Sequence, residues 1–456
     1  FLNSLMISTK AVAAIRRFRV ESGKTLRLGL PVVAAHMLLI SMQFVDTVMA
    51  GHVSATDLAA LAIASALFHP LVLFLVGILM VVSPMVAQLK GGGVEGEISL
   101  VVKEALHLSL GLAVPSILLL HLLEPLMSFI GYPPKVTRIG DSYLRAVSWG
   151  MPAILAYGVL RHFNEGLSIT RPSMYFHIIG LVLNVFGNYT LMFGHFGFSA
   201  MGTIGAGWST AMVWTLMLMM MFAYNLKNRA LKRYRLLNNF IRFSYPNIHE
   251  ILRIGVPNGF STGAETGLFP LVALMMGTLG VSVMAAHQIA INVAAMTFMV
   301  PLGLSAAITV RIGQAVGRGK WDEVRYLGFS GVILCGMVML VPASAYLFIP
   351  EWIAKIYTSD TEVLEVAVRL LLMAAVFQLS DGLQVGALGA LRGLKDTRVP
   401  LIINVISYLM IGLPGAYLLG ILGGYGPEGL WTGIIAGLSV AAMLHNLRFY
   451  LLTRRD

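Results

Sequence analysis

Long runs of apolar residues, separated by short polar or basic stretches, dominate this chain. A helix that crosses the hydrocarbon core of a bilayer needs about 20 predominantly apolar residues. We predict twelve such helices, with approximate limits of 28–50, 57–82, 100–123, 141–160, 173–193, 201–225, 252–279, 283–310, 327–349, 364–391, 399–420 and 428–451. The pattern therefore predicts an all-α integral membrane protein with twelve transmembrane helices.

Composition agrees with this class. Of the 456 residues, 57% are hydrophobic and 12% are charged, whereas soluble domains have roughly half and roughly a quarter. The net charge is +11, and most Lys and Arg side chains fall in alternate loops, which the positive-inside rule assigns to the cytoplasm. We expect a multi-pass protein of the cell (inner) membrane with both termini cytoplasmic. Charges at membrane ends account for the basic surplus, so we expect no nucleic-acid partner.

The two halves of the chain repeat each other. A shift of 226 residues places "LGLP" (28–31) on "IGVP" (254–257) and "AQLKGGG" (87–93) on "GQAVGRG" (313–319). Each half holds six spans, an even number, so the halves enter the membrane in the same direction and form two lobes related by a pseudo-twofold axis along the membrane normal. The predicted division is a cytoplasmic N-terminal segment at 1–27, an N-lobe at 28–225, a basic linker at 226–251 and a C-lobe at 252–456.

Four motifs occur in order along this frame: "FVDTVMAG" (44–51), "PMVAQLKGGG" (84–93), "EGLSITRP" (165–172) and "LRGLKDTRVP" (391–400). With them the chain resembles the multidrug and toxic compound extrusion (MATE) family, in particular its bacterial NorM-like branch. The resemblance implies a cation-coupled antiporter that expels organic, often cationic, drugs.

Three carboxylates lie well inside predicted spans: Asp46, Glu265 and Asp381. Ionisable groups within a membrane are costly and usually serve transport. Glu265 and Asp381 fall near mid-depth of the seventh and tenth helices, so they can share one cavity, where two carboxylates compete for a proton, a sodium ion or a cationic substrate. In the resembled NorM-like proteins the matching acidic pair is assigned to cation coupling. We therefore predict a cation-coupling site, including a possible Na⁺ site, at Glu265 and Asp381.

Asp46 belongs to the other lobe, and its expected companions are Asn184 and Asn188, whose i, i+4 spacing puts both amides on one helix face. A carboxylate and two amides suit a hard cation or a hydrogen-bond network. Two alternatives stay open: Asp46 reaches interfacial water, and the asparagines join helices. Pro31 is an ordinary helix start or, as the family resemblance suggests, a point where the first helix bends during transport.

Further residues are candidates for lining the substrate or cation cavity. Phe377 lies one turn before Asp381, where its ring can meet a bound cation, and Met296 belongs to a group of methionines that suit a cavity accepting many flat cations. Most Met and Phe side chains are alternatively expected to face lipid. Gln288 and Gln384 complete the set.

The absence of a phosphate-binding GxxxxGK[ST] motif predicts that transport draws on an ion gradient rather than on a nucleotide. The coupling ion is Na⁺ or H⁺, and no cofactor is expected. We predict a monomeric multidrug antiporter whose partners are small organic cations and the lipid bilayer. The runner-up, a lipid-linked precursor flippase of the same superfamily, requires cationic residues in its cleft, and the predicted spans offer no clear Lys or Arg. A channel is less favoured, and an enzyme least, since no nucleophile, metal or acid–base cluster is visible.

Overall fold

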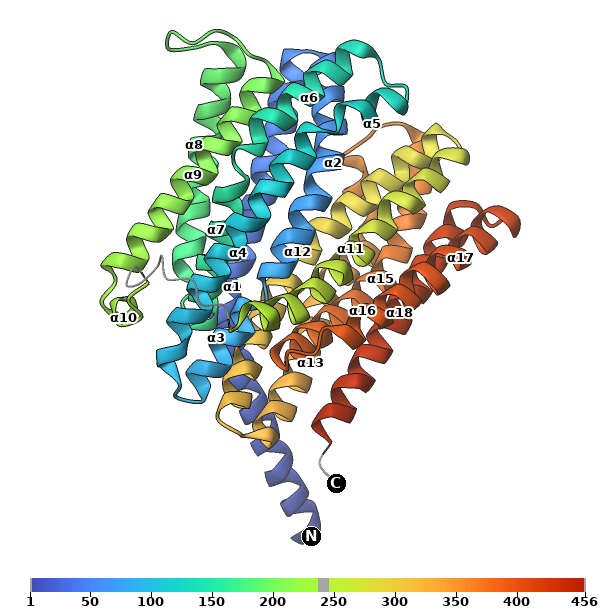
Figure 1. Ribbon diagram of the computed structural model, residues 1–456. Coiled ribbons are helices and arrows are strands. Elements are labelled where there is room, and N and C mark those ends of the chain that lie inside the picture. Colours follow the sequence, from blue (N-terminus) through green and yellow to red (C-terminus); the bar gives the residue numbers. More distant parts are fainter. Residues whose placement is uncertain (1, 237–245, 455–456) are drawn as a thin grey trace. The chain divides into compact units, whose positions relative to one another are not determined.

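The computed structural model describes residues 2–236 and 246–454, with side chains from residue 12 onward (Figure 1). Every regular element of these residues is a helix. Part of the predicted basic linker, residues 237–245, lies outside the described residues. The expectation of an all-α fold is confirmed.

The chain divides into two compact units. Unit 1 joins the described residues up to Val33 to those from Ala264 onward, and unit 2 runs from Ala34 to Gly263. Two helices are shared between the units, α1 (Leu2–Val53) and α11 (Ile248–Thr278). Unit 2 otherwise contains α2 (Ala55–Leu79), α3 (Val82–Gly91), α4 (Glu95–His121), α5 (Glu124–Phe129), α6 (Pro134–Ser148), α7 (Met151–Gly166), α8 (Arg171–Phe193), α9 (Thr203–Lys227) and α10 (Arg229–Lys232). Unit 1 otherwise contains α12 (Val281–Gly317), α13 (Trp321–Phe348), α14 (Pro350–Lys355), α15 (Thr361–Gly393), α16 (Arg398–Asn404), α17 (Leu413–Ala416), α18 (Gly426–Thr453) and the π-helical segments Val405–Gly412 and Tyr417–Leu422.

The unit boundaries fall inside α1 and α11 and not in loops. The predicted N-terminal segment 1–27 and the first predicted span are one continuous helix, and Pro31 lies inside it. The reading of Pro31 as a helix start is therefore wrong, because α1 begins many turns before it. An internal proline removes one backbone hydrogen bond and weakens the helix at that point. The bend during transport stays a prediction, as does the lobe division at residues 28 and 252.

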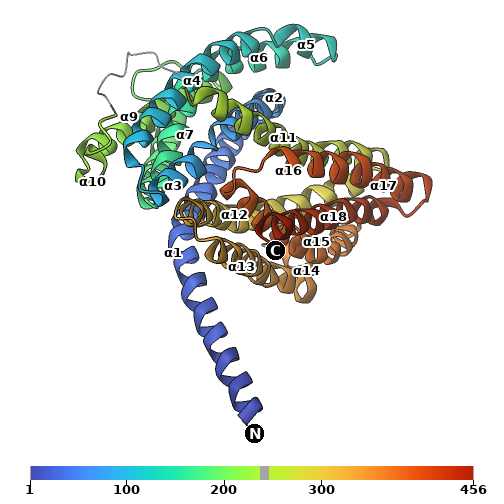
Figure 2. The same cartoon turned by 60° about the horizontal axis from the view of Figure 1, so that its bottom comes forward.

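Helix α15 is the central helix of unit 1. It packs against α12, α13 and α18 (Figure 2). Its N-terminus is capped by Asp360, whose carboxylate accepts hydrogen bonds from the backbone N–H groups of Glu362 at 2.9 Å and Val363 at 3.2 Å. Such a cap satisfies two of the four donors that a helix start leaves unpaired. Packing against three neighbouring helices surrounds α15, which carries Asp381 in its second half.

Glycines bring α18 against the helical segment formed by residues 398–422. Gly429, Gly433 and Gly437 recur every fourth residue on α18, and a Cβ atom at Gly429 would stand 2.7 Å from the Cα of Gly420. At Gly433 a Cβ would overlap the backbone of Ala416. Small residues at this spacing let membrane helices approach backbone to backbone. The π-helical residues 405–412 lie along this contact, with Ser407 and Gly412 against Gly437.

Unit 2 packs α8 against α9, α6 against α9 and α4 against α7. The predicted fourth span at 141–160 is divided here: α6 ends at Ser148 and α7 begins at Met151, with Pro152 in its first turn. Proline fits a first turn because its missing N–H would be unpaired there in any case. Helix α8 ends at Phe193 and is capped by Gly194, which adopts φ 77°, a left-handed conformation that glycine takes without strain.

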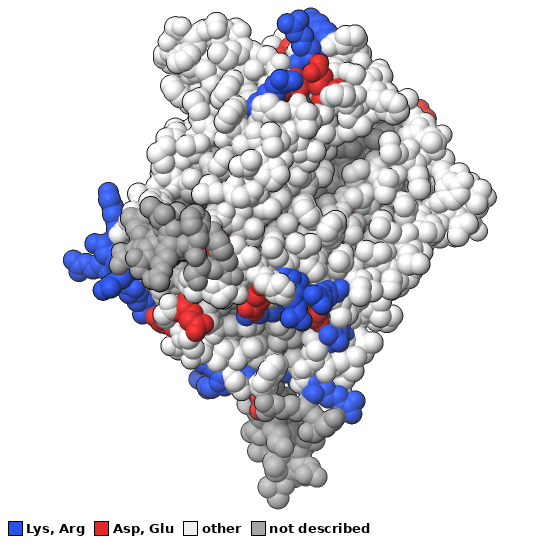
Figure 3. All heavy atoms as spheres, viewed as in Figure 1, with Lys and Arg blue, Asp and Glu red and all other residues white. Residues whose placement is uncertain are grey.

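Ten helices of the described chain are long and apolar enough to cross a membrane. Helix α11 is not among them, since glycine, asparagine and Glu265 lower its hydropathy. The count of twelve spans fits these helices and stays a prediction. Figure 3 shows, on the viewed face, that charged side chains gather toward helix ends and that the surface between them is almost free of charge.

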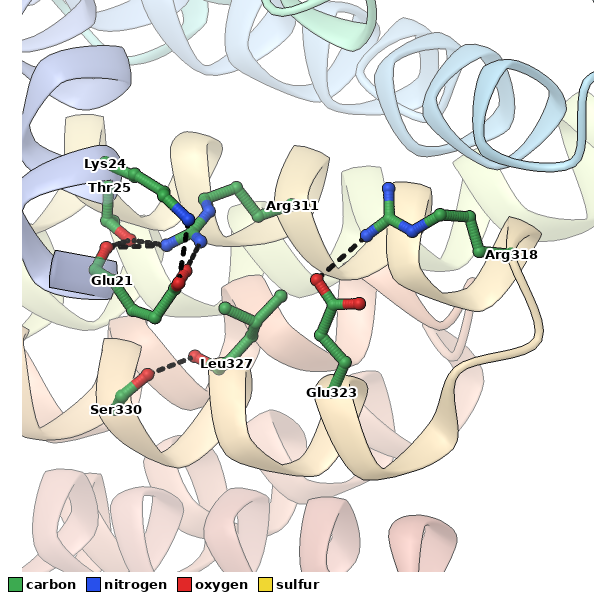
Figure 4. A network of polar contacts seen from close by, with 8 residues as sticks. All are labelled: Glu21, Lys24, Thr25, Arg311, Arg318, Glu323, Leu327 and Ser330. Carbon is green, nitrogen blue, oxygen red and sulfur yellow. Dashed lines mark hydrogen bonds and ion pairs between the residues drawn. The ribbon is translucent and has the colours of Figure 1, made fainter. Parts of the chain in front are cut away.

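The first part of α1 is fixed within unit 1 by a polar network (Figure 4). Arg311 of α12 donates to the backbone oxygen of Glu21 at 2.7 Å and to the hydroxyl of Thr25 at 2.6 Å, and it forms an ion pair with the Glu21 carboxylate. Lys24 donates to the same carboxylate at 2.8 Å. One guanidinium thus holds two successive turns of α1.

Candidate cation and substrate sites

Unit 2 contains a cavity of about 340 Å³. Its lining includes Asp46 of α1, Tyr143 of α6 and the ring of Trp214 of α9. Most of the remaining lining side chains are aliphatic or aromatic. Pockets of this size, apolar with a few polar groups, are typical sites for small organic ligands.

Asp46 is held in this cavity by two amides. Its Oδ1 accepts hydrogen bonds from Asn184 Nδ2 at 3.0 Å and from Asn188 Nδ2 at 2.6 Å. Both asparagines are fully buried, and the carbonyl oxygen of each has no hydrogen-bond partner among the described residues. The i, i+4 spacing of Asn184 and Asn188 predicted that both would share a site with Asp46, and both side chains are in direct contact with it. Their part in cation binding stays a prediction.

A second polar cluster of unit 2 joins the same cavity and was missed by the sequence analysis. Arg161 lines the cavity and donates from Nε to Glu165 Oε1 at 2.7 Å. The other oxygen of Glu165 contacts His162 Nδ1 at 3.0 Å. Arg161 also donates from Nη2 to His36 Nε2 at 2.8 Å. All of these groups except His36 come from one helix, α7. Glu165 is buried, and Arg161 is partly buried.

The sequence analysis expected no Lys or Arg in the cleft, whereas Arg161 lines the cavity of unit 2. Arg161 lies one residue beyond the predicted limit of its span, and α7 continues to Gly166. Arg392 likewise lies one residue beyond the predicted tenth span, and α15 continues to Gly393. The usable signal was the i, i+4 spacing of Arg161 and Glu165 within "RHFNEG".

Unit 1 brings Glu265 of α11 and Asp381 of α15 into each other's electrostatic range. Asp381 is 3% exposed, and its carboxylate accepts no hydrogen bond from the described residues. The guanidinium of Arg392 lies close enough to attract Glu265. Asp381 is buried and Glu265 is partly exposed. Two carboxylates with one nearby guanidinium leave an excess of negative charge, which a proton or a small cation would neutralise.

Gln384 and Tyr408 border the acidic pair. Both are fully buried, and the charges of Glu265 and Asp381 reach the Tyr408 hydroxyl. The Gln384 amide lies beside that hydroxyl, without the geometry of a hydrogen bond. Buried polar atoms of this kind usually bind water or an ion. Among the described residues, the amide atoms of Gln384 have no hydrogen-bond partner.

The other predicted cavity residues lie differently. Phe377 is buried, with its ring against Phe269 at 6.1 Å and Trp431 at 5.7 Å between centroids. Gln288 is exposed on unit 1, as is Met296. A cation–π role for Phe377 would need its ring face free, and edge contacts with two aromatic rings occupy part of its surface. The roles of these three residues stay predictions.

No group of three or more His, Cys, Asp or Glu side chains able to hold a metal ion occurs in the described residues. Two carboxylate sites remain as candidates for a cation: Asp46, which accepts from the Nδ2 atoms of Asn184 and Asn188, and the Glu265–Asp381 pair. Carboxylate and amide oxygens suit hard cations such as Na⁺.

The comparison with known families finds the same internal repeat that the sequence shows. Residues 31–190 and again residues 257–418 match the model of the MatE family. The chain belongs to the MatE family. The two matches begin at residues 31 and 257, so the internal repeat lies at the shift that the sequence predicted, and the resemblance to this family is confirmed.

Relatives cover nearly the whole chain. The multidrug resistance protein NorM of Photobacterium profundum is 39% identical over 438 residues, which are 95% of this chain and 96% of the relative. The multidrug resistance protein PmpM of Pseudomonas aeruginosa is 38% identical over 448 residues, with 96% and 93% covered. The crystal structure of the eukaryotic MATE transporter AtDTX14 matches with a TM-score of 0.84 at 19% identity, covering 95% of this chain and 96% of that one.

Family and fold together define the class of this protein. Ten apolar helices and the fold of a MATE transporter make it a multi-pass membrane protein. The similarity to NorM proteins places it near the bacterial branch of the family.

Proposed function

We propose that this MatE protein is a multidrug efflux antiporter that exports organic, mainly cationic, lipophilic compounds in exchange for inward Na⁺ or H⁺. Relatives named multidrug resistance proteins at 36% to 39% identity support the transport of drugs. On this proposal the protein is a transporter and not an enzyme, needs no cofactor beyond its coupling ion, acts as a monomer without nucleic acid, and lies in the inner membrane with both termini cytoplasmic.

One observation carries the coupling proposal. Asp381 is buried in a membrane helix beside Glu265, and its carboxylate accepts no hydrogen bond from the described residues. Such a pair is stable only if a proton or a cation reduces its charge. Binding of the coupling ion at Glu265 and Asp381 therefore shifts the conformational equilibrium of the transporter away from the state that binds the drug.

Asp46 serves as the cation site of unit 2. The amide N–H groups of Asn184 and Asn188 donate hydrogen bonds to its carboxylate. Rotation of either amide by 180° about its terminal bond exchanges N–H for a carbonyl oxygen. The same three side chains would then offer oxygen ligands to a cation. Export follows if ion and drug prefer different states of the transporter, since only a difference in affinity can shift a conformational equilibrium.

The flippase alternative requires net positive charge to hold a pyrophosphate. Arg161 does line the cavity of unit 2, but Glu165 pairs with it at 2.7 Å, and Asp46 adds a negative charge. The net charge of the ionised groups at this cavity therefore favours cations over anions.

The decisive experiment is efflux of a fluorescent organic cation from proteoliposomes, with a Na⁺ gradient or a proton gradient imposed separately. We expect export under one of the two gradients, and the effective gradient identifies the ion. Transport that is equally fast with no gradient would indicate a channel. No movement of any cationic dye under either gradient would overturn the antiporter proposal and favour the flippase.

A further inference from the structure

The cavity of unit 2 is lined by a base as well as an acid. Asp46 and Arg161 both contribute to its wall. The side chain of Arg161 is 13% exposed, whereas that of its partner Glu165 is 3% exposed and does not line the cavity. A guanidinium therefore faces the cavity, with its neutralising carboxylate behind it.

This placement has an electrostatic consequence. Within a membrane protein the effective dielectric constant is low, and a unit charge acts strongly over about 10 Å. An unpaired guanidinium in the wall would repel organic cations and oppose the field of Asp46. With Glu165 ionised, the Arg161–Glu165 pair is neutral, and Asp46 alone sets the sign of the potential.

The contacts of Glu165 fit this role. Its two oxygens are occupied by Arg161 Nε at 2.7 Å and His162 Nδ1 at 3.0 Å. Arg161 in turn donates to His36 Nε2 at 2.8 Å, so that ring nitrogen accepts and His36 is neutral in this contact. A buried ion pair of this kind contributes little net stability compared with apolar residues, so packing alone does not account for it.

We propose that Glu165 is a specificity-determining residue: by neutralising Arg161 it makes the unit 2 cavity selective for organic cations over organic anions. The inference rests on the proposed function, because it assumes that the exported compound enters this cavity. Glu165 acts through Arg161 and does not touch the compound.

Two measurements test this. The first is equilibrium binding of a fluorescent organic cation, such as ethidium, and of an organic anion, such as fluorescein, to purified protein in detergent without any gradient. For Glu165→Gln we expect the Kd of the cation to rise about tenfold, as one uncompensated charge at about 10 Å implies, and anion binding to strengthen. For Arg161→Gln we expect cation binding at least as tight as in the wild type.

The matched control is the double variant Arg161→Gln, Glu165→Gln, which removes both charges. We expect its Kd for the cation to return to within about twofold of the wild type. A merely structural pair predicts the opposite, since the double variant lacks the Arg161–Glu165 ion pair and should bind no better than Glu165→Gln. Glu165→Asp keeps the charge and should stay close to the wild type.

The second measurement is cation efflux by the same variants in proteoliposomes. We expect Glu165→Gln to raise KM about tenfold, with a maximal rate that changes less than about twofold. Unchanged cation binding in Glu165→Gln, or no recovery in the double variant, would overturn the inference. If Glu165→Gln does not fold, Arg161→Gln still tests the proposal, because weaker cation binding by Arg161→Gln than by the wild type would contradict it. A wild type that binds cations but exports none would overturn the antiporter function while leaving the binding test intact.

Discussion

The two acidic sites of this protein occupy repeated halves, yet they are built at different positions. A shift of 226 residues places Val272 at the position of Asp46 and Leu39 at that of Glu265, and a shift of 227 places Ile154 at that of Asp381. Leu39 and Ile154 line the cavity of unit 2. The halves therefore share a fold, and each has acquired its own carboxylates.

The helices beside these acids differ as well. In unit 2 the regular helix α8 brings Asn184 and Asn188 to Asp46. The matching segment of unit 1 is π-helical over Val405–Gly412 and brings Tyr408 to the acidic pair. π-Helical turns are rare and occur often at functional sites. One site is thus satisfied by neutral donors, and the other retains uncompensated negative charge, so the comparison predicts unequal roles in coupling.

The largest effect is expected from removing charge in unit 1. In Asp381→Asn or Glu265→Gln the repulsion that favours ion uptake is lost, and we expect gradient-driven dye efflux to fall by about a hundredfold, equivalent to about 2.7 kcal/mol. Initial rates in proteoliposomes, normalised to the amount of folded protein, measure this. Dye binding in detergent serves as the control and should change much less. Normal efflux in both variants would sink the assignment of the coupling site.

The close approach of the two helices in unit 1 gives the next effect. In Gly433→Ala the new Cβ overlaps the backbone of Ala416, and overpacking of this kind costs about 2 kcal/mol. We expect the Tm in detergent to fall by about 5 °C. Gly415→Ala is the matched control, because its Cβ would lie 3.7 Å from the Cα of Gly433, an ordinary contact. Equal Tm values for the two variants would show that α17 moves away from α18 at little cost.

The sequence predicted most of the fold. It predicted a site where the spacing of residues along one helix was enough to place them on the same face. Apolar runs of about 20 residues indicated the helices, and the i, i+4 pair Asn184 and Asn188 pointed to one face, where both contact Asp46. The Arg161–Glu165 pair was missed because hydropathy marks where apolar residues stop and not where the helix stops. The π-helical winding could not be predicted from the sequence. It occurs where the segment packs closely against α18, and this tertiary contact leaves no local pattern in the residues themselves.

Removal of the Asp46 charge is expected to have a smaller effect than removal of either acid of unit 1. In Asp46→Asn the cavity loses its negative charge while its shape is kept, and we expect efflux at low dye concentration to fall about tenfold, chiefly through KM. Dependence on the ion gradient should persist. The measurement is KM and maximal rate with and without the gradient. If Asp46→Asn abolishes coupling as completely as Glu265→Gln does, the unequal roles of the two sites are refuted.

The smallest effect concerns two equivalent positions, one within α1 and one directly before α11, that are fixed by different chemistry. Glu21 of α1 forms an ion pair with Arg311 in unit 1. Its counterpart at a shift of 226, Asn247, donates from its backbone N–H to Glu104 in unit 2 at 2.8 Å and from its side chain at 3.2 Å. We expect Glu21→Gln to cost about 1 kcal/mol, or about 2 °C in Tm, at low ionic strength.

Salt distinguishes the two contacts. An ion pair that is partly accessible to water is screened when the Debye length falls to about 3 Å in about 1 M salt, so the Tm difference between Glu21→Gln and the wild type should shrink there. For Glu104→Gln the partner Asn247 is neutral, and the loss should depend much less on salt. Thermal unfolding of both variants at low and high NaCl, with KCl as a second salt to separate screening from Na⁺ binding, measures this. An equal response to salt would mean that the charge of Arg311 contributes nothing to holding α1, and that its two hydrogen bonds to the Glu21 backbone oxygen and Thr25 are sufficient.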